Sequence, residues 1–504
     1  MLNAASVNAG NFALAAGALP EPSAIRVVDR VARLEPAARL LPQTTYTVRA
    51  TPGIQDTFGQ TLAEPVQRSF VTADASWKET LQLPFTGVPT GPEIAVAMDP
   101  KGNAWGAWTT EGSIFVNRYD VNTGAWNTSV IGGNSAFTID GPQLAADGAG
   151  NAVVVWAQRY RYHAVYASRY TAATGTWETP RLVSSDSSNT HNSMARVVMR
   201  ADGVITLAWR RAGAGVFVST AGIDTQYGWS TPIRIDDPDT TTDNEVATLA
   251  VAVSPTPGGR AAIAWSTGHL FQNAEVWVSE FGGSAPWPFA RPRRLSVAGS
   301  VNDRDVGVSV DIAGHVHVLW RHDETPSGGV GSMLQFAHFD GTRWSAPQLI
   351  SSTLASFGGA AIATQTELGQ QPATWVSWFG AGPRVMATRL RGTSVDTPQV
   401  VGVPPAASLN SNQRTALVVD RAGNVVVSWT SGTTSAEGRV MVARRVARLG
   451  AWQAVRTLEQ MPIDFPFTPV LAANASGDVL VAWKAYFAEP AQPTTMPVYT
   501  KRFD

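Results

Sequence analysis

The chain has 504 residues, with 38 Lys and Arg against 39 Asp and Glu, and it contains no cysteine. This length predicts more than one domain, and the balanced charge argues against a nucleic-acid partner, because clustered Lys and Arg bind such partners. The lack of cysteine excludes disulfides, thiolate metal ligands and a cysteine nucleophile. No apolar run approaches the roughly 20 residues of a membrane-spanning helix, so we expect no membrane span.

Residues 1–20 are rich in small side chains, but they lack the positively charged start and continuous apolar stretch of a secretory signal peptide. Abundant Ser, Thr, Gly, Asn and Trp are nevertheless typical of exported proteins. We therefore expect an extracellular or cell-surface protein whose export signal is not present in this chain and lay upstream of Met1.

Residues 1–74 are predicted to form a separate unit. Its second half alternates apolar and polar residues with the period of β-strands, and turn residues separate these strands. The stretch resembles the bacterial Ig-like domains of S-layer and other surface proteins. The residues that carry the resemblance are Leu41-Pro42, residues 44–48 (TTYTV), Asp56, Gly59 and Leu62 of a hairpin, and Ser69-Phe70-Val71-Thr72. The resemblance implies a bacterial surface protein and a β-sandwich spacer. The sandwich is expected to be N-terminally incomplete, because the first strands of the family are not recognisable.

From Trp77 onward, a tight turn followed by a short apolar strand that ends in tryptophan recurs eight times. The clearest copies are DPKGNAWGAW (99–108), DGAGNAVVVW (147–156), DIAGHVHVLW (311–320) and DRAGNVVVSW (420–429). The strand-ending tryptophans are Trp108, Trp156, Trp209, Trp265, Trp320, Trp378, Trp429 and Trp483. A repeat of about 50 residues is typical of propellers and solenoids.

Each repeat is predicted to contain four strands, with the fourth beginning at a second tryptophan. The last repeat, after Trp483, has only three strands, whereas residues 76–85 (SWKETLQLPF) have the pattern of a fourth strand that stands alone. Pairing these two segments would close a ring and remove two open sheet edges. The sequence thus predicts an all-β chain: a partial Ig-like β-sandwich (residues 1–74) followed by an eight-bladed β-propeller (residues 75–504) closed by an N-terminal strand.

The repeated residues themselves favour structural roles. A turn with one Asp, one Asn and one Gly offers too few oxygen ligands for calcium, and Gly provides the positive φ of a tight hairpin. Tryptophans at fixed positions of a repeat are explained more simply by packing between blades than by stacking on sugars. His315 and His317 are expected on one side of a strand, as core or inter-blade residues.

Long, variable connections are predicted at one face of the propeller, where the fourth strand passes to the next repeat and the second strand passes to the third. Binding residues concentrate on such loops. The candidate ligand-binding residues are Arg159, Arg161, Tyr162, His163, His191, Arg210, His269, Asp303, Arg321, His322 and Tyr486. The same loops carry Asn192 and Arg211. Arg beside His and Tyr is suited to a carboxylate-bearing glycan, and an ordinary solvated loop surface is the alternative.

The acidic stretch 236–245 offers Asp237, Asp239 and Asp243 as calcium ligands, although their spacing differs from that of an EF-hand. Calcium is the one cofactor for which the sequence provides a candidate site. No nucleophile elbow, zinc-protease motif or phosphate-binding loop is present.

The leading hypothesis is a non-enzymatic secreted or cell-surface binding or adhesion protein, whose propeller presents the long-loop face to a glycan or a cell-surface protein. One alternative is a carbohydrate-active enzyme, either a polysaccharide lyase or a glycoside hydrolase, on the same face. A lyase would require Tyr, His and Arg to converge there, and residues 159–163 are their best local source. A structural component of a surface layer or filament is a further alternative.

Overall fold

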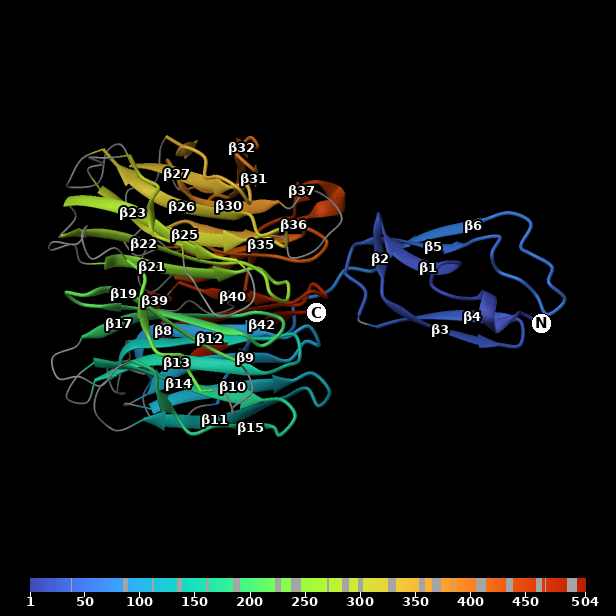
Figure 1. The fold of residues 1–504 in the computed structure, drawn as a ribbon, viewed down its shortest axis with the longest axis horizontal. Coiled ribbons are helices and arrows are strands. Elements are labelled where there is room, and N and C mark those ends of the chain that lie inside the picture. The colour runs from blue at the N-terminus through green and yellow to red at the C-terminus, as the bar shows by residue number, and fades with distance from the viewer. Residues whose placement is uncertain are drawn as a thin grey trace.

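The computed structural model places a small N-terminal unit beside a larger body of stacked sheets (Figure 1). It describes residues 1–37, 39–84, 89–110, 113–133, 138–159, 163–184, 191–222, 228–236, 246–269, 272–282, 290–297, 302–324, 332–352, 359–364, 373–382, 384–404, 414–431, 438–458, 465–466, 468–486 and 496–504. These residues form β-strands with two short 3₁₀ helices, η1 (Ala4–Ser6) and η4 (Ala447–Leu449). No helix among them is long and apolar enough to cross a membrane.

The N-terminal unit consists of two antiparallel sheets. One has the strand order β2-β1-β5-β6 and the other is the hairpin β3-β4. The strands are β1 (Phe12–Ala16), β2 (Leu19–Glu21), β3 (Ser23–Val28), β4 (Val31–Pro36), β5 (Thr45–Ala50) and β6 (Val66–Val71). Tyr46 of β5 is fully buried and its hydroxyl accepts a hydrogen bond from the backbone N–H of Leu41 at 3.0 Å. Strands β1 to β4 precede Leu41, the first of the residues that carry the resemblance to the bacterial Ig-like domains.

In the body, each sheet has a first, second and third strand in antiparallel order, followed by one or two outer segments. The sheets in the first half are β8 (Pro89–Met98), β9 (Ala104–Thr110), β10 (Ser113–Asp120) and β11 (Ala125–Gly133); β12 (Thr138–Ala146), β13 (Ala152–Arg159), β14 (His163–Thr171), β15 (Thr176–Trp177) and β16 (Arg181–Leu182); β17 (Asn192–Met199), β18 (Ile205–Arg211), β19 (Gly215–Ala221) and β20 (Ile233–Arg234); and β21 (Val246–Val253), β22 (Ala261–His269), β23 (Gln272–Phe281) and β24 (Arg293–Arg294).

The second half repeats this arrangement. Its sheets are β25 (Asn302–Val310), β26 (Val316–Asp323), β27 (Ser332–Phe339) and β28 (Gln348–Ser351); β29 (Ala361–Thr364), β30 (Thr374–Gly380), β31 (Arg384–Arg391), β32 (Ser394–Val395) and β33 (Gln399–Gly402); β34 (Ala416–Val419), β35 (Val425–Ser431), β36 (Arg439–Val446), β37 (Ala451–Trp452) and β38 (Arg456–Thr457); and β39 (Phe465–Pro466), β40 (Val470–Ala473), β41 (Val479–Tyr486) and β42 (Val498–Phe503) with β7 (Leu81–Gln82). A parallel bridge between Ala274 and Asn302 links β23 to β25.

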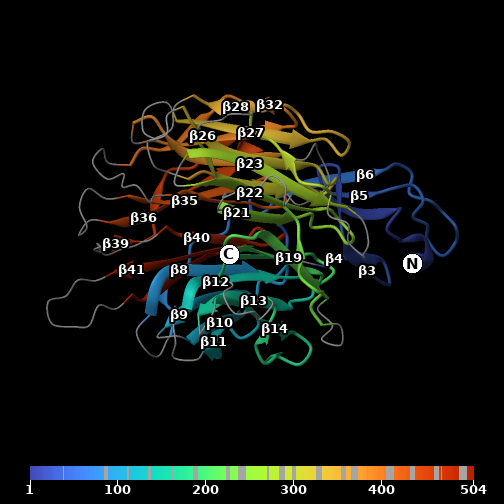
Figure 2. The same cartoon turned by 60° about the vertical axis from the view of Figure 1, so that its left-hand side comes forward.

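The first strands contact one another in chain order, from β8 through β12, β17, β21, β25, β29 and β34 to β40, and β40 contacts β8. In Figure 2 the last strands, β40 and β41, lie next to β8. Strand β7 pairs with β42, and Trp77 bridges to Phe503 with a ring-centroid distance of 5.2 Å. The predicted pairing of the Trp77 segment with the end of the chain is therefore present.

The outer edge of most sheets is not the continuous fourth strand that the sequence predicted. Strand β11 spans nine residues, whereas the corresponding segment of the next sheet is split into β15 and β16. Pro180 lies between the two short pieces, and proline cannot donate a hydrogen bond to the neighbouring strand. In the sixth repeat Val395 of β32 pairs with Leu390 of β31, at the position where Trp177 of β15 pairs with Tyr170 of β14 in the second repeat.

The repeated tryptophans are core residues, as predicted. All eight are buried with at most 2% of their surface exposed, and several stack on an aromatic residue directly opposite in the third strand. Trp156 faces Tyr166 at 6.0 Å, and Trp209 faces Phe217 at 6.1 Å. Such cross-strand aromatic pairs stabilise a sheet beyond the area they bury, so the period of the repeat reflects packing.

The turns between first and second strands are held by their own side chains. In the second repeat, the carboxylate of Asp147 accepts hydrogen bonds from the backbone N–H groups of Ala149 and Asn151 and from Nδ2 of Asn151. Oδ1 of Asn151 in turn accepts from the backbone N–H of Ala172, at the end of the third strand. The polar residues of this turn therefore join three strands through their hydrogen bonds.

The N-terminal unit contacts the sheets at this turn end. In the last repeat the two polar residues are exchanged, with Asn474 in the position of the Asp and Asp478 in that of the Asn. The carboxylate of Asp478 pairs with Arg39 of the N-terminal unit at 3.1 Å. Arg421 of another turn pairs with Glu21 at 3.0 Å. The opposite end of the sheets, the loop end, is where the first strands begin and the second strands stop, and Figure 1 shows it on the far side from the N-terminal unit.

Candidate functional site

The predicted ligand-binding residues that the structure describes lie at the loop end of the sheets. Arg159, His269 and Tyr486 are the last residues of β13, β22 and β41. His163, His191, Arg210, Asp303, Arg321 and His322 are at or next to the ends of β14, β17, β18, β25 and β26. Arg161, Tyr162, Asp237, Asp239 and Asp243 lie outside the described residues.

Two of these residues come together between the second and third sheets of the body. His163 begins β14, His191 precedes β17, and the two form a parallel backbone bridge. Their imidazole rings meet edge to face, with centroids 4.5 Å apart and an interplanar angle of 80°. His163 is half-buried and His191 is exposed, so the pair lies where solvent can reach one ring.

Asn192 ties this pair to its neighbours. Its side chain is fully buried, and its Nδ2 donates to the backbone carbonyl of His163 at 2.7 Å. Its Oδ1 accepts hydrogen bonds from Nε1 of Trp209 at 3.0 Å and from Nε of Arg211 at 3.2 Å. One amide therefore fixes the histidine strand, the repeat tryptophan and an arginine in a single arrangement.

The guanidinium of Arg211 lies over the ring of Phe217, 4.0 Å from its centroid. Burial lowers the pKa of Arg211 from its ordinary value, but an arginine of this kind keeps its charge at neutral pH. We call His163, His191, Asn192, Trp209 and Arg211 the β14–β17 seam. It combines two imidazoles with a fixed cation.

The backbone beside the seam is irregular. The pairing of β17 with β18 shifts between Ser193 and Arg196, and Met194 has a φ of 54°. Asp305 has a φ of 55° at the corresponding shift in β25, between Arg304 and Gly307. Positive φ in residues other than Gly costs free energy and is concentrated at functional sites.

A second histidine at the loop end is paired with a carboxylate. Nδ1 of His322 is 2.6 Å from Oδ1 of Asp303, and the side chain of Asp303 is 1% exposed against 19% for that of His322. The hydrogen bond and charge of Asp303 raise the pKa of His322. The other oxygen of Asp303 is buried and has no hydrogen-bond partner among the described residues.

Arg321, predicted beside these two, faces the other side of the sheet. Its Nε donates to Asp323 at 2.7 Å, and its Nη2 donates to Ser332 at 2.7 Å. Arg304 completes the group with an ion pair to Asp323 at 2.8 Å. The side chains of Arg304, Arg321 and Asp323 are all largely buried. This group therefore has the character of a structural ion-pair network.

Arg210 is not part of the seam. It lies opposite Ser193, whereas Arg211 lies opposite Asn192, and successive residues of a strand point to opposite faces. Both arginines were visible in the sequence, but only the register of β17 against β18 decides which of them bonds to Asn192.

Of the two histidines of the fifth repeat, His317 is an inter-sheet residue, as expected, whereas His315 lies half-buried in a turn of its own repeat and not in the core or between sheets. His317 is buried between its own sheet and the next, within hydrogen-bond distance of the carbonyl of Gly392 at 3.2 Å and the hydroxyl of Thr374 at 3.0 Å. His315 fills the position of the turn Asn and bonds to Asp311 at 2.8 Å. Among the described residues, no three His, Asp or Glu side chains are arranged to hold a metal ion.

Residues 1–72 match the family model of the bacterial Ig-like domain. No curated protein matches the chain. Among solved structures, the Dos1 propeller is similar with a TM-score of 0.51 and 6% identity, over 85% of this chain and 95% of that one. This likeness shows that the body has a propeller-like fold.

Two similar structures are of polysaccharide-degrading enzymes. A polysaccharide lyase, an ulvan lyase, has a TM-score of 0.45 and 10% identity, over 75% of this chain and 95% of that one. An α-L-arabinanase from Penicillium chrysogenum in complex with arabinobiose has a TM-score of 0.39 and 11% identity, over 60% of this chain and 94% of that one. The leading hypothesis of a non-enzymatic binding protein is corrected, because the similar structures include a polysaccharide lyase and an arabinanase. At these identities the likeness itself is one of fold alone.

Proposed function

We propose that the protein is an extracellular polysaccharide lyase that cleaves a uronate-containing glycan at the loop end of an eight-bladed propeller. The observation that carries the proposal is the β14–β17 seam, where Asn192 hydrogen-bonds both to the backbone of His163, whose ring packs on that of His191, and to the guanidinium of Arg211. Elimination from a uronate needs a base for the proton next to the carboxylate and a cation for the carboxylate itself. The seam provides both.

The eight-bladed, closed ring is part of the proposal. Its support is the order of contacts between the first strands, which runs from β8 to β40 and returns to β8, together with the pairing of β7 with β42. A closed ring gathers the loop ends of all its sheets around one axis. Residues that are distant in the sequence then surround a single bound chain of sugars.

In the proposed reaction His191, the more exposed imidazole, takes the proton from C5 of the uronate. The electrons of the C5–H bond form the C4=C5 double bond while the C4–O4 bond breaks, and the departing oxygen takes a proton from water. His163 holds the ring of His191 from the side. Arg211 pairs with the uronate carboxylate and lowers the cost of the negative charge that develops at C5.

Glycoside hydrolysis is less well supported by the same face. That reaction needs two carboxyl groups free to act as acid and as base or nucleophile. Among the described residues, three aspartates at the loop end are already engaged: Asp303 with His322, Asp323 with Arg321 and Arg304, and Asp305 with Arg414. These three carboxylates are therefore not free to act as the acid or the base of hydrolysis.

An extracellular or cell-surface location is proposed from the bacterial Ig-like match of residues 1–72. On this view the N-terminal unit spaces the propeller from the cell. Its contacts with the turn end, through Arg39, Glu21 and their partners, leave the loop end free for a glycan.

The test is a set of uronate polymers, including polygalacturonate and alginate, assayed by the ultraviolet absorbance of the unsaturated product. We expect the wild-type protein to cleave at least one polymer, and His191→Gln and Arg211→Gln to lose activity by about 100-fold or more. The matched control is Arg210→Gln, which removes the neighbouring arginine from the opposite face. Cleavage by the seam variants at the wild-type rate, or no cleavage of any uronate polymer, would overturn the proposal.

A further inference from the structure

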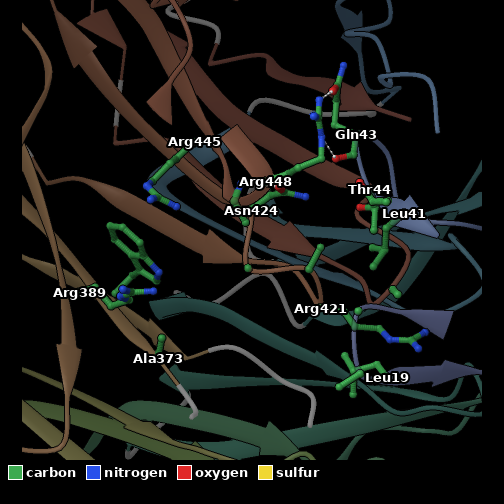
Figure 3. Close-up of a pocket in the computed structure, with 18 of the residues that line it drawn as sticks. Leu19, Leu41, Gln43, Thr44, Ala373, Arg389, Arg421, Asn424, Arg445 and Arg448 are labelled. Atoms are coloured by element: carbon green, nitrogen blue, oxygen red, sulfur yellow. Dashed lines mark hydrogen bonds between the residues drawn. The ribbon is translucent and has the colours of Figure 1, made fainter. Parts of the chain in front are cut away.

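A cavity of about 500 Å³ lies between the N-terminal unit and the turn end of the sheets (Figure 3). This volume is within the range of small-molecule sites. The cavity is on the opposite end of the sheets from the β14–β17 seam. Five arginines line it: Arg389, Arg391, Arg421, Arg445 and Arg448. None of the lining residues that the structure describes is acidic.

In the part of the chain that the structure describes, two carboxylates form ion pairs with these five arginines. Asp396 accepts from Arg389 at 3.0 Å and lies 3.5 Å from Arg391, and Glu21 pairs with Arg421 at 3.0 Å. Arg448 is bound to neutral groups, namely the backbone carbonyl and side-chain oxygen of Gln43. The cavity therefore has an excess of positive charge, and an anion inside it would relieve the repulsion among the guanidinium groups.

Arg445 is the lining arginine whose surroundings best suit the binding of an anion. Its guanidinium lies over the indole of Trp375, 5.0 Å from the ring centroid, and its Nε is buried without a hydrogen-bond partner among the described residues. Burial lowers the pKa of Arg445, an effect that Asp396 opposes. The guanidinium is a planar fork of N–H groups, and its contact with an aromatic ring limits its freedom, which suits bidentate pairing with a carboxylate or sulfate.

Both units build the cavity. Residues 16–19 and 41–45 of the N-terminal unit form one wall, and the arginines of the sheets form the other. Figure 3 shows Gln43, Thr44 and Asn424 among its polar groups, with Arg448 hydrogen-bonded to Gln43 across the junction. Amide and hydroxyl groups of this kind match the hydroxyls of a sugar.

We propose that this junction cavity binds a short anionic saccharide, whose carboxylate or sulfate group pairs with Arg445 and Arg389 and whose hydroxyls bond to Gln43 and Thr44. The site is separate from the proposed catalytic face and does not depend on it. Because the ligand contacts both units, its binding also stabilises their association.

The experiment measures binding by isothermal titration with four probes: a galacturonate trisaccharide, a sulfated disaccharide, a neutral trisaccharide and inorganic sulfate. We expect saturable binding of an acidic saccharide, no binding of the neutral one, and at least tenfold weaker binding of inorganic sulfate. Arg445→Gln and Arg389→Gln are expected to weaken the saccharide at least tenfold, while Arg445→Lys, which keeps the charge without the planar fork, gives an intermediate loss.

Arg343→Gln is the control, since this arginine is 87% exposed and does not line the cavity. Circular dichroism and thermal unfolding without ligand establish that each variant is folded. Saccharide binding that persists in both Arg445→Gln and Arg389→Gln would place the ligand elsewhere and overturn the proposal, as would the failure of both acidic saccharides to bind. Equal affinity for inorganic sulfate would overturn the saccharide assignment. Because the cavity is at the opposite end of the sheets from the seam, Arg445→Gln should cleave the polymer at the wild-type rate. A failure of the cavity proposal can therefore be distinguished from a failure of the lyase proposal.

Discussion

The imidazoles of His322 and His317 have opposite surroundings and therefore opposite pKa shifts. Asp303 holds Nδ1 of His322 and raises its pKa above the usual 6.5. His317 is buried beside His338, with ring centroids 4.4 Å apart, and burial followed by the charge of that neighbour lowers its pKa to about 3. The two residues respond to pH in different ranges and with different signs.

For His322, the pair with Asp303 stabilises the folded protein fully below pH 6.5, and this contribution is lost as the pH rises through the raised folded-state pKa. Asp303→Asn removes the charge that binds the imidazolium. We expect it to lower the free energy of unfolding more at pH 5.5 than at pH 9, as measured by urea denaturation at both values. An equal loss at the two pH values would show that the pair is not coupled to protonation.

For His317, the unfolded chain takes up a proton near pH 6.5, whereas the folded protein does so only at about 3. Stability should therefore decrease as the pH falls between these values, by about 1.4 kcal/mol per pH unit for one proton. His317→Gln cannot take up this proton, so its stability should decrease less steeply with falling pH in urea denaturation. His315→Gln, at a half-buried turn position, is the control. An unchanged slope in His317→Gln would contradict this assignment.

At the scale of the element, the turns between first and second strands show how a short polar motif stabilises a whole sheet. Asp147 receives three hydrogen bonds, and its partner Asn151 extends the network to the third strand. Removal of the carboxylate leaves buried donors without acceptors, which costs more than the hydrogen bonds themselves contribute.

We expect Asp147→Ala to lower the free energy of unfolding by about 3 kcal/mol, because at least two buried N–H groups lose their acceptor. Asp340→Ala, in an exposed turn with similar hydrogen bonds to Thr342 and Arg343, should cost far less. Urea denaturation with and without calcium provides the measurement. A calcium-dependent stability of the wild-type protein that Asp147→Ala abolishes would contradict the structural role of the turn.

The sequence was sufficient to predict the second and third strands, because the tryptophans that end the second strands recur at a period of about 50 residues, which is typical of propellers. It was insufficient for the outer strands, whose pairing depends on local backbone breaks such as the one at Pro180. It also could not choose between Arg210 and Arg211, because a shift of one residue in register moves a side chain to the other face. The approach of His163 to His191 depends on how two sheets stack.

At the scale of the whole molecule, the first strands of the sheets contact one another in a cycle. Strand β7 and Trp77, at the start of the body, pair with β42 at its end. Trp77 packs on Phe503, and residues of the last two sheets surround them. The N-terminal unit is attached just before this segment, and Asp74 pairs with the buried Arg444 at 2.6 Å. We call the pairing of residues 77–82 with β42 the latch. The latch and the attachment of the N-terminal unit therefore share one stretch of chain.

Trp77→Ala is expected to lower the unfolding free energy by about 3 kcal/mol, the usual cost of removing a packed aromatic side chain. Trp177→Ala, in the outer segment of a sheet that is continuous in the chain, is the matched control for the local loss of packing. Only Trp77→Ala should also speed proteolysis near the C-terminus, because opening the latch exposes β42. Equal proteolysis of the two variants would show that the N-terminal segment does not hold the last strands in place.

The most direct test of the account is the chemistry of the product when a uronate polymer is cleaved in water labelled with heavy oxygen. Elimination at the β14–β17 seam predicts fragments that carry a C4=C5 double bond and no label, with their formation lost in His191→Gln and retained in Arg445→Gln. Fragments that carry the label and no double bond would identify hydrolysis and contradict the central claim.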